Sequence, residues 1–239
     1  MPDERKEVKR MSRRKNFITF CILLVVIPMV VAGGVLVFRE KYYAWLSLCV
    51  AVLTCIPLFY AFERKESSSA ELTVLAVMIA LSVAGRFIFA WIPGFKPVTA
   101  ITVIVAMYLG KEAGFVIGSL SAVVSNFYFG QGPWTPFQMF AWGLLGFIAG
   151  LISKPLRKNK VVLCIYGAVA GIMFSAVMDV WNVLWVNGTF ETGKYMAALV
   201  TALPVTVEYA VSNIIFILLL AKPIGEKLER IKKKYGLFL

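Results

Sequence analysis

Three charged side chains interrupt the apolar stretches of this chain of 239 residues. Arg86 lies inside the apolar run Leu72–Trp91, and Asp179 and Glu208 lie inside two later runs. A charge at the centre of a bilayer costs at least about 2.5–3.5 kcal/mol on the insertion scale, so such residues are usually paired or functional. Together they predict a polar cavity that opens to one side of a membrane and binds a solute.

The elements that must position these charges are transmembrane helices. The chain is 60% hydrophobic with a mean hydropathy of +0.80, whereas soluble domains are about 45–50% apolar. A spanning helix needs about 20 mostly apolar residues and satisfies its backbone amides internally, as lipid requires. The sequence predicts an all-α integral membrane protein with eight spans, at residues 17–38, 44–62, 72–92, 97–110, 112–129, 137–153, 161–186 and 195–221.

The positive charges sort by side of the membrane in this scheme. Of the 25 Lys and Arg residues, four lie in loops on one side and 20 lie on the other, in residues 1–16, 63–71, Lys111, 153–160 and 222–239. The positive-inside rule then predicts that both termini are cytoplasmic and that the three intramembrane charges share the outer half of the bilayer. The net charge of +12 therefore indicates topology signals and contacts with membrane lipid, and no nucleic-acid partner.

The polar, serine-rich segment 63–71 predicts a cytoplasmic linker. It separates an accessory two-helix hairpin, 17–62, from a six-helix unit, 72–222, that carries every intramembrane charge. Residues 1–16 and 223–239 are expected to be basic cytoplasmic ends. The second of these ends is predicted to be either a short interfacial helix or a solvated tail.

Amides and aromatic side chains gather near the predicted cavity. The loop after the fifth span is rich in them, and Gln138 and Trp142 follow at the i and i+4 positions of a helix. Such side chains suit a flat, polar organic ligand, although Tyr128 and Trp134 also fit an aromatic belt at the membrane interface. The predicted substrate-binding residues are Arg86, Asn126, Tyr128, Gln131, Trp134, Gln138, Trp142, Asp179, Asn182 and Glu208.

Two other roles for the charges stay open. Arg86 could form a buried ion pair with one acid that fixes helix packing, or Asp179 and Glu208 could form a proton relay in a stand-alone proton-coupled carrier. A membrane enzyme fits less well, because the chain has no histidine, no Cys-x-x-Cys and no nucleophile–base pair. We therefore expect no enzymatic activity, no metal site and no cofactor.

Small residues at positions 76, 80 and 84 lie four apart in the third span. Ala76, Ala80 and Ala84 would form a flat strip on one side of a helix, where another helix can approach closely. The strip predicts either a docking surface for a partner or packing inside the same chain.

The six-helix unit resembles the substrate-binding S component of energy-coupling factor (ECF) vitamin transporters, over roughly residues 72–222. It is similar in particular to S components assigned to cobalamin-like or uncharacterised substrates. The run from Gln131 to Met139 is the most specific part. The motifs that carry the resemblance are Ala76-x-x-x-Ala80, Gly85-Arg86, Pro93-Gly94-Phe95-Lys96-Pro97, Gly110-Lys111-Glu112-Ala113-Gly114, Ser125-Asn126-Phe127, Gly130-Gln131-Gly132-Pro133-Trp134-Thr135-Pro136-Phe137-Gln138-Met139 and Gly143-Leu144-Leu145-Gly146.

The resemblance implies a six-helix bundle in a bacterial plasma membrane that captures a vitamin-like small molecule from outside. It implies docking on a transmembrane T component through the alanine strip, with two cytoplasmic ATPase subunits that drive transport. The chain contains no Walker motif of its own, which agrees with ATP hydrolysis by a partner. The two additional N-terminal helices set this chain apart from the family pattern.

Overall fold

The structure is a computed structural model that describes residues 17–37, 43–62, 68–188 and 190–237. Every regular element in these residues is a helix, which confirms the all-α prediction. The elements, in chain order, are η1 (Ile22–Val26), α2 (Ile27–Val37), α3 (Tyr43–Phe62), α4 (Ser69–Ile88), α5 (Val98–Leu109), α6 (Lys111–Phe129), α7 (Thr135–Leu151), α8 (Ser153–Lys158), α9 (Lys160–Asn187), α10 (Thr192–Thr201) and α11 (Leu203–Tyr235).

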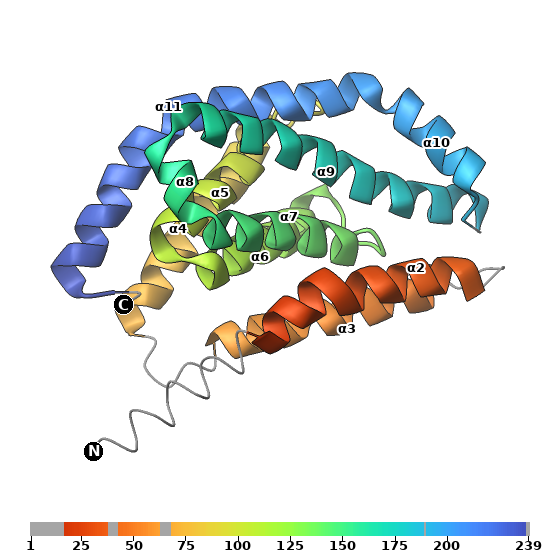
Figure 1. Cartoon of the computed structure of the whole chain (residues 1–239), viewed down its shortest axis with the longest axis horizontal. Helices are drawn as coiled ribbons and strands as arrows, with labels where there is room; N and C mark the ends of the chain where they lie inside the picture. Colours follow the sequence, from red (N-terminus) through yellow and green to blue (C-terminus); the bar gives the residue numbers. More distant parts are fainter. Residues whose placement is uncertain (1–16, 38–42, 63–67, 189, 238–239) are drawn as a thin grey trace, which may run out of the picture.

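The helices lie in layers around α5 (Figure 1). Helices α9, α10 and α11 form one side, α6 and α7 lie in the middle, and the α2–α3 hairpin lies on the opposite side. All residues of α5 except Tyr108 are buried, as expected for a helix that is apolar all round. Helix α5 packs against α6, α7 and α11, so it forms the centre of the core.

Three helices in the described part of the chain are long and apolar enough to cross a membrane, namely α4, α9 and α11. Shorter apolar helices cover residues 17–33, 45–60, α5 and α7. These lengths support an integral membrane protein. The count of eight spans and the side on which the termini lie stay predictions.

Helix α4 begins at Ser69, inside the segment that the sequence predicted to be a linker. Ser68 caps it, because its Oγ accepts a hydrogen bond from the backbone N–H of Glu71 at 3.2 Å. A serine followed three residues later by glutamate is a common helix start. Helix α4 therefore starts three residues before the apolar run that begins at residue 72.

The predicted single span 195–221 is two helices in the structure, α10 and α11. Pro204 lies in the first turn of α11, where its missing N–H does no harm, but it could not continue the hydrogen bonds of α10. Helix α11 then passes through Pro223 and ends at Tyr235. The predicted basic tail 223–239 is thus helical over most of its length.

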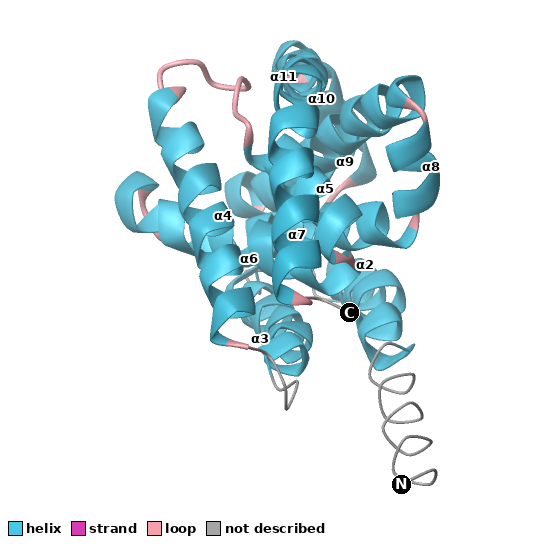
Figure 2. Ribbon diagram, turned by 90° about the vertical axis from the view of Figure 1, so that its left-hand side faces the viewer, coloured by secondary structure: helices cyan, strands magenta, loops and turns pink. Residues whose placement is uncertain are grey.

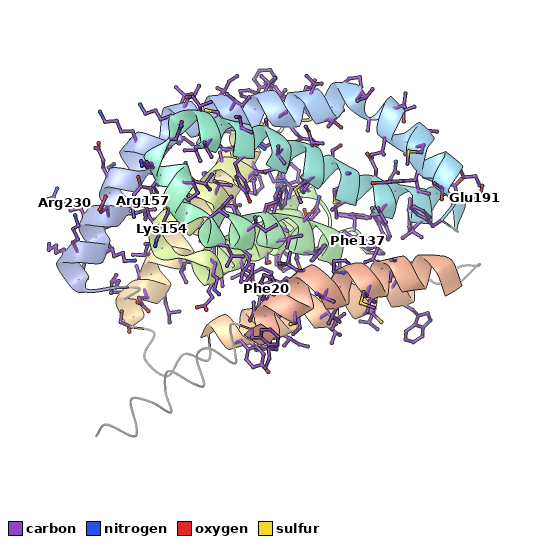
Figure 3. All side chains as sticks on the ribbon, in the orientation of Figure 1. Phe20, Phe137, Lys154, Arg157, Glu191 and Arg230 are labelled. Atoms are coloured by element: carbon purple, nitrogen blue, oxygen red, sulfur yellow. The ribbon has the colours of Figure 1, made fainter. Side chains whose placement is uncertain are left out.

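The last part of α11 runs along the end of the bundle beside α8 (Figures 1 and 2). An ion pair joins them, with Arg157 and Glu229 at 3.4 Å. Figure 3 shows Lys154, Arg157 and Arg230 at this end of the molecule and Glu191 at the other. The basic side chains of α8 and α11 therefore share one end, as the predicted topology requires.

The N-terminal hairpin packs on the bundle through α7 and α6. Leu23, Ile27 and Val50 are fully buried on its inner face, whereas Met29 and Phe59 are 67% and 73% exposed. The hairpin is therefore attached to the bundle along one face and offers apolar side chains to the surroundings along the other.

Helices α6 and α7 approach each other at the level of the backbone. A Cβ on Gly118 of α6 would overlap the backbone of Trp142 in α7, and a Cβ on Gly146 of α7 would overlap the backbone of Gly114. Small residues allow this close contact between helices. The glycines thus fix the spacing of the two helices that carry most of the polar residues described below.

Replacing Gly118 with alanine tests this spacing. The added methyl group must push the two backbones apart, and overpacking of this kind costs about 1–3 kcal/mol. We expect a lower melting temperature and yield in detergent. The matched control is Gly193→Ala in α10, where an added Cβ meets nothing within 4 Å and stability should hold or rise slightly. Equal melting temperatures for the two variants would contradict the proposed close packing.

Candidate functional site

The site is built around the side chain of Arg86, in the last turn of α4. Arg86 is only 7% exposed. Its Nη1 donates to Ser125 Oγ and to Asn126 Oδ1, the latter at 2.8 Å, and both partners lie on α6. Its Nε has no partner among the described residues. Arg86 is thus held by neutral side chains in this part of the chain, which differs from the expected alternative of an ion pair with one acid.

A chain of hydrogen bonds continues from Asn126 into α7 and the loop before it. Asn126 Nδ2 donates to Thr135 Oγ1 at 2.9 Å and to Gln138 Oε1 at 2.7 Å. Thr135 Oγ1 donates to Gln131 Oε1 at 3.0 Å, and Gln131 Nε2 donates to the carbonyl of Val123 at 2.8 Å. This network joins α4, α6 and α7, and it ties the loop 130–134 to α6.

Aromatic rings flank the guanidinium and extend the site across the bundle. Arg86 Cζ lies 4.6 Å from the ring centroid of Phe129 and 5.3 Å from that of Trp142. Trp142 stacks on Phe174 with centroids 4.7 Å apart, and Phe174 meets the ring of Tyr209 edge-on at 5.2 Å. Helices α4, α6, α7, α9 and α11 each supply one member of this stack. Cation–π contacts of a desolvated arginine contribute about 2 kcal/mol each.

The two acids lie on α9 and α11, the helices that also supply Phe174 and Tyr209. Asp179 is 8% exposed, and its Oδ2 has no hydrogen-bond partner in the part of the chain that the structure describes. Glu208 is exposed and accepts a hydrogen bond from the backbone N–H of Gly94 at 2.9 Å.

The loop 89–97 lies against α11 at the edge of the site. Besides the contact of Gly94 with Glu208, the backbone N–H of Lys96 donates to Ser212 Oγ at 2.9 Å, and Ser212 Oγ donates back to the Lys96 carbonyl at 3.2 Å. Burial lowers the pKa of Lys96, the positive charge of Arg86 lowers it further, and Glu208 opposes both. Lys96 in this loop therefore interacts electrostatically with both Arg86 and Glu208.

Five of the predicted residues lie in or beside the network, and others lie outside it. Arg86, Asn126, Gln131 and Gln138 are joined by its hydrogen bonds, and Trp142 lies beside Arg86. Trp134 belongs to the loop before α7. Tyr128 is 75% exposed and packs on Phe87 and Phe129, and Asn182 is exposed. Within the described residues, these two side chains take no part in the hydrogen-bond network.

Sequence reasoning missed several residues that complete the site. Ser125 and Thr135 are its hydroxyl groups, and Phe129, Phe174 and Tyr209 are its rings. Ser125 could have been found, because it directly precedes Asn126 inside an apolar run. Phe174 has no such signal, since a phenylalanine in an apolar helix is ordinarily a packing residue.

The alanine strip faces away from the bundle. Ala76, Ala80 and Ala84 are all exposed, while Leu75 and Met78 on the same helix are buried. The strip is therefore not used for packing within the described part of this chain.

A buried arginine, amides and aromatic rings thus gather inside a bundle whose apolar helices indicate a membrane protein. Comparison with protein families identifies it further. A family model described as "ECF-type riboflavin transporter, S component" matches residues 66–230, which is more than half of the chain. The chain therefore belongs to the family of ECF S components, the substrate-specific subunits of these transporters, and this confirms the resemblance.

The match begins just before α4, so the α2–α3 hairpin lies outside it. Comparisons with curated proteins and with solved structures found no match. The family consists of transporter subunits, a non-enzymatic class.

Removal of the guanidinium tests the site. Arg86→Ala deletes the charge and both hydrogen bonds to α6, so affinity for riboflavin, the vitamin named in the description of the matching family, should fall by about 1–3 kcal/mol. Isothermal calorimetry measures the affinity. The matched control is Arg157→Ala, whose side chain is 42% exposed and pairs with Glu229 at the end of the bundle, and it should bind normally. A well-folded Arg86→Ala variant with unchanged affinity would reject the binding role.

Proposed function

We propose that this chain is the substrate-binding subunit of an ATP-driven ECF importer in a bacterial plasma membrane. It captures a vitamin-like molecule from outside and docks on a T component that carries two cytoplasmic ATPases. The observation that carries the proposal is the buried network of Arg86, Asn126 and Gln138 beside the stack of Trp142 on Phe174. It lies inside the part of the chain that matches the S-component family.

The side chains favour a flat ligand with several polar atoms. Arg86 Nε is a buried donor without a partner, and Asp179 Oδ2 is a buried acceptor without one, in the described part of the chain. An unpaired buried polar group costs about 1–3 kcal/mol, which a ligand that pairs with it recovers. The rings of Trp142, Phe174 and Tyr209 add apolar area that suits an aromatic vitamin.

Riboflavin is the first substrate to test, because the description of the matching family names it. Its fused ring system is flat and carries carbonyl oxygens, ring nitrogens and an N–H group. A corrinoid of the cobalamin type, which the resemblance in the sequence suggested, is the second substrate to test. The proposed substrate class is therefore a riboflavin-like heteroaromatic vitamin.

Small-molecule analysis of the purified protein tests the substrate. Mass spectrometry of the material released by denaturation should detect a flat heteroaromatic vitamin. Added riboflavin should lose its fluorescence on binding to ligand-free protein, because it stacks against tryptophan and tyrosine. Cobalamin binding without riboflavin binding would overturn the choice of substrate. Failure to bind any member of a vitamin panel would overturn the capture role itself.

The alanine strip supports docking on the T component. Its three alanines are exposed on one face of α4, and exposed small residues let a partner helix approach closely. In the predicted topology, Ala76 and Ala80 lie in the cytoplasmic half of the membrane, away from Arg86. Docking and ligand binding would thus use different parts of one helix.

Ala76→Trp and Ala80→Trp separate docking from binding. A bulky ring on the strip keeps the partner helix at a distance, and overpacking at such a contact costs about 1–3 kcal/mol. Riboflavin affinity should persist, whereas uptake and co-purification of the ATPases should be lost. Ala197→Trp on α10, also at an exposed position, is the control. Uptake that persists without any co-purifying ATPase would instead favour the proton-coupled carrier.

A further inference from the structure

Arg86 can only donate its hydrogen bonds, and this fixes donor and acceptor in the bonds that follow it. An arginine side chain has donors and no acceptor, so the Asn126 atom 2.8 Å from its Nη1 must be the carbonyl oxygen. The amide nitrogen of Asn126 then faces Thr135 and Gln138, at 2.9 and 2.7 Å. Gln138 must accept through Oε1, and its Nε2 is the amide group that remains.

Two N–H groups of this network therefore remain without an acceptor among the described residues. Gln138 is half-buried, and its Nε2 makes no hydrogen bond to any described residue. Arg86 Nε is buried and also without a partner in the described part of the chain. Trp142 lies one turn after Gln138 on the same side of α7. These N–H groups belong to side chains that are joined through Asn126 and lie beside Trp142, and no carboxylate of the described residues takes part in these hydrogen bonds.

We propose that Arg86, acting through Asn126, fixes the amide of Gln138 so that the site reads a hydrogen-bond acceptor edge on its ligand. This inference rests on the proposed function and specifies its substrate class: a ring that presents carbonyl oxygens or unprotonated ring nitrogens toward α4 and α7. Asn126 is then a positioning residue. It touches no ligand, but it decides whether Gln138 offers a donor or an acceptor.

Asn126→Asp should turn the group that Gln138 offers to the ligand from a donor into an acceptor, with almost no change in the shape of the side chain at position 126. A carboxylate only accepts, so Gln138 must turn its Nε2 toward it and present Oε1 to the ligand. Arg86 and Gln138 can both donate to the new carboxylate, and Arg86 gains an opposite charge, while Thr135 can donate to it by giving up its bond to Gln131. The melting temperature should therefore equal or exceed that of the wild type, whereas Asn126→Leu, which leaves the buried guanidinium without this acceptor, should melt lower.

Riboflavin is the probe for recognition. Its Kd should rise at least about ten-fold in Asn126→Asp, because a donor–acceptor contact becomes an acceptor–acceptor contact. Gln138→Met removes the amide that carries the effect. In that background, Asn126→Asp should change the riboflavin Kd no further, so the two substitutions should be strongly non-additive in a double-mutant cycle.

Three results would overturn the inference, and a fourth bears on the proposed function alone. If Asn126→Asp melts as low as Asn126→Leu, the hydrogen bonds from Arg86 through Asn126 to Gln138, here called the relay, do not have the stated direction. If Asn126→Asp is stable and keeps the wild-type riboflavin Kd, or if its effect persists in Gln138→Met, the relay does not govern recognition. If the wild-type protein binds no riboflavin, the proposed substrate fails, and the melting temperatures still decide the direction of the relay.

Discussion

The burial of one guanidinium is the constraint on which the rest of the site depends. A charge moved from water into an apolar interior costs several kcal/mol unless other groups replace its hydration. Around Arg86 these groups are the oxygens of Ser125 and Asn126 and the faces of Phe129 and Trp142. They come from α6 and α7, so the charge on α4 can be accommodated only when these helices are in place.

The glycines of α6 and α7 make that arrangement possible. Asparagine and glutamine have short side chains, and Asn126 reaches Gln138 at 2.7 Å only because the two helices approach closely. Gly118 and Gly143 lie where a side chain would overlap the opposite helix. The packing motif and the polar network are therefore one structural unit: backbone contact along the helices brings the amides at their ends within hydrogen-bond distance.

The sequence predicted the helix ends closely at the break marked by Gly110 and Lys111. The runs 97–110 and 112–129 differ by no more than one residue at either end from α5 and α6. The break between α10 and α11 was missed because the apolar run continues across Pro204, so hydropathy alone shows no boundary. Arg86, Asn126, Gln138 and Trp142 could be selected by residue type. The partner of Arg86 could not, because the neighbours of a charge depend on which helices pack together, and neutral side chains fill that role.

The geometry of α4 explains how one helix can serve two contacts. An α-helix turns about 100° per residue, so the alanines at 76, 80 and 84 share one side, and Arg86, two residues after Ala84, lies about 200° further round. The exposures agree, since the alanines are exposed and Arg86 is buried. Gly85 packs so closely on Pro97 that an added Cβ would overlap its ring, which ties this end of α4 to the loop 89–97. Because the strip is exposed and the guanidinium is buried on the same continuous helix, we expect a substitution in the strip to leave the contacts of Arg86 in place, so the two proposed roles can be measured separately.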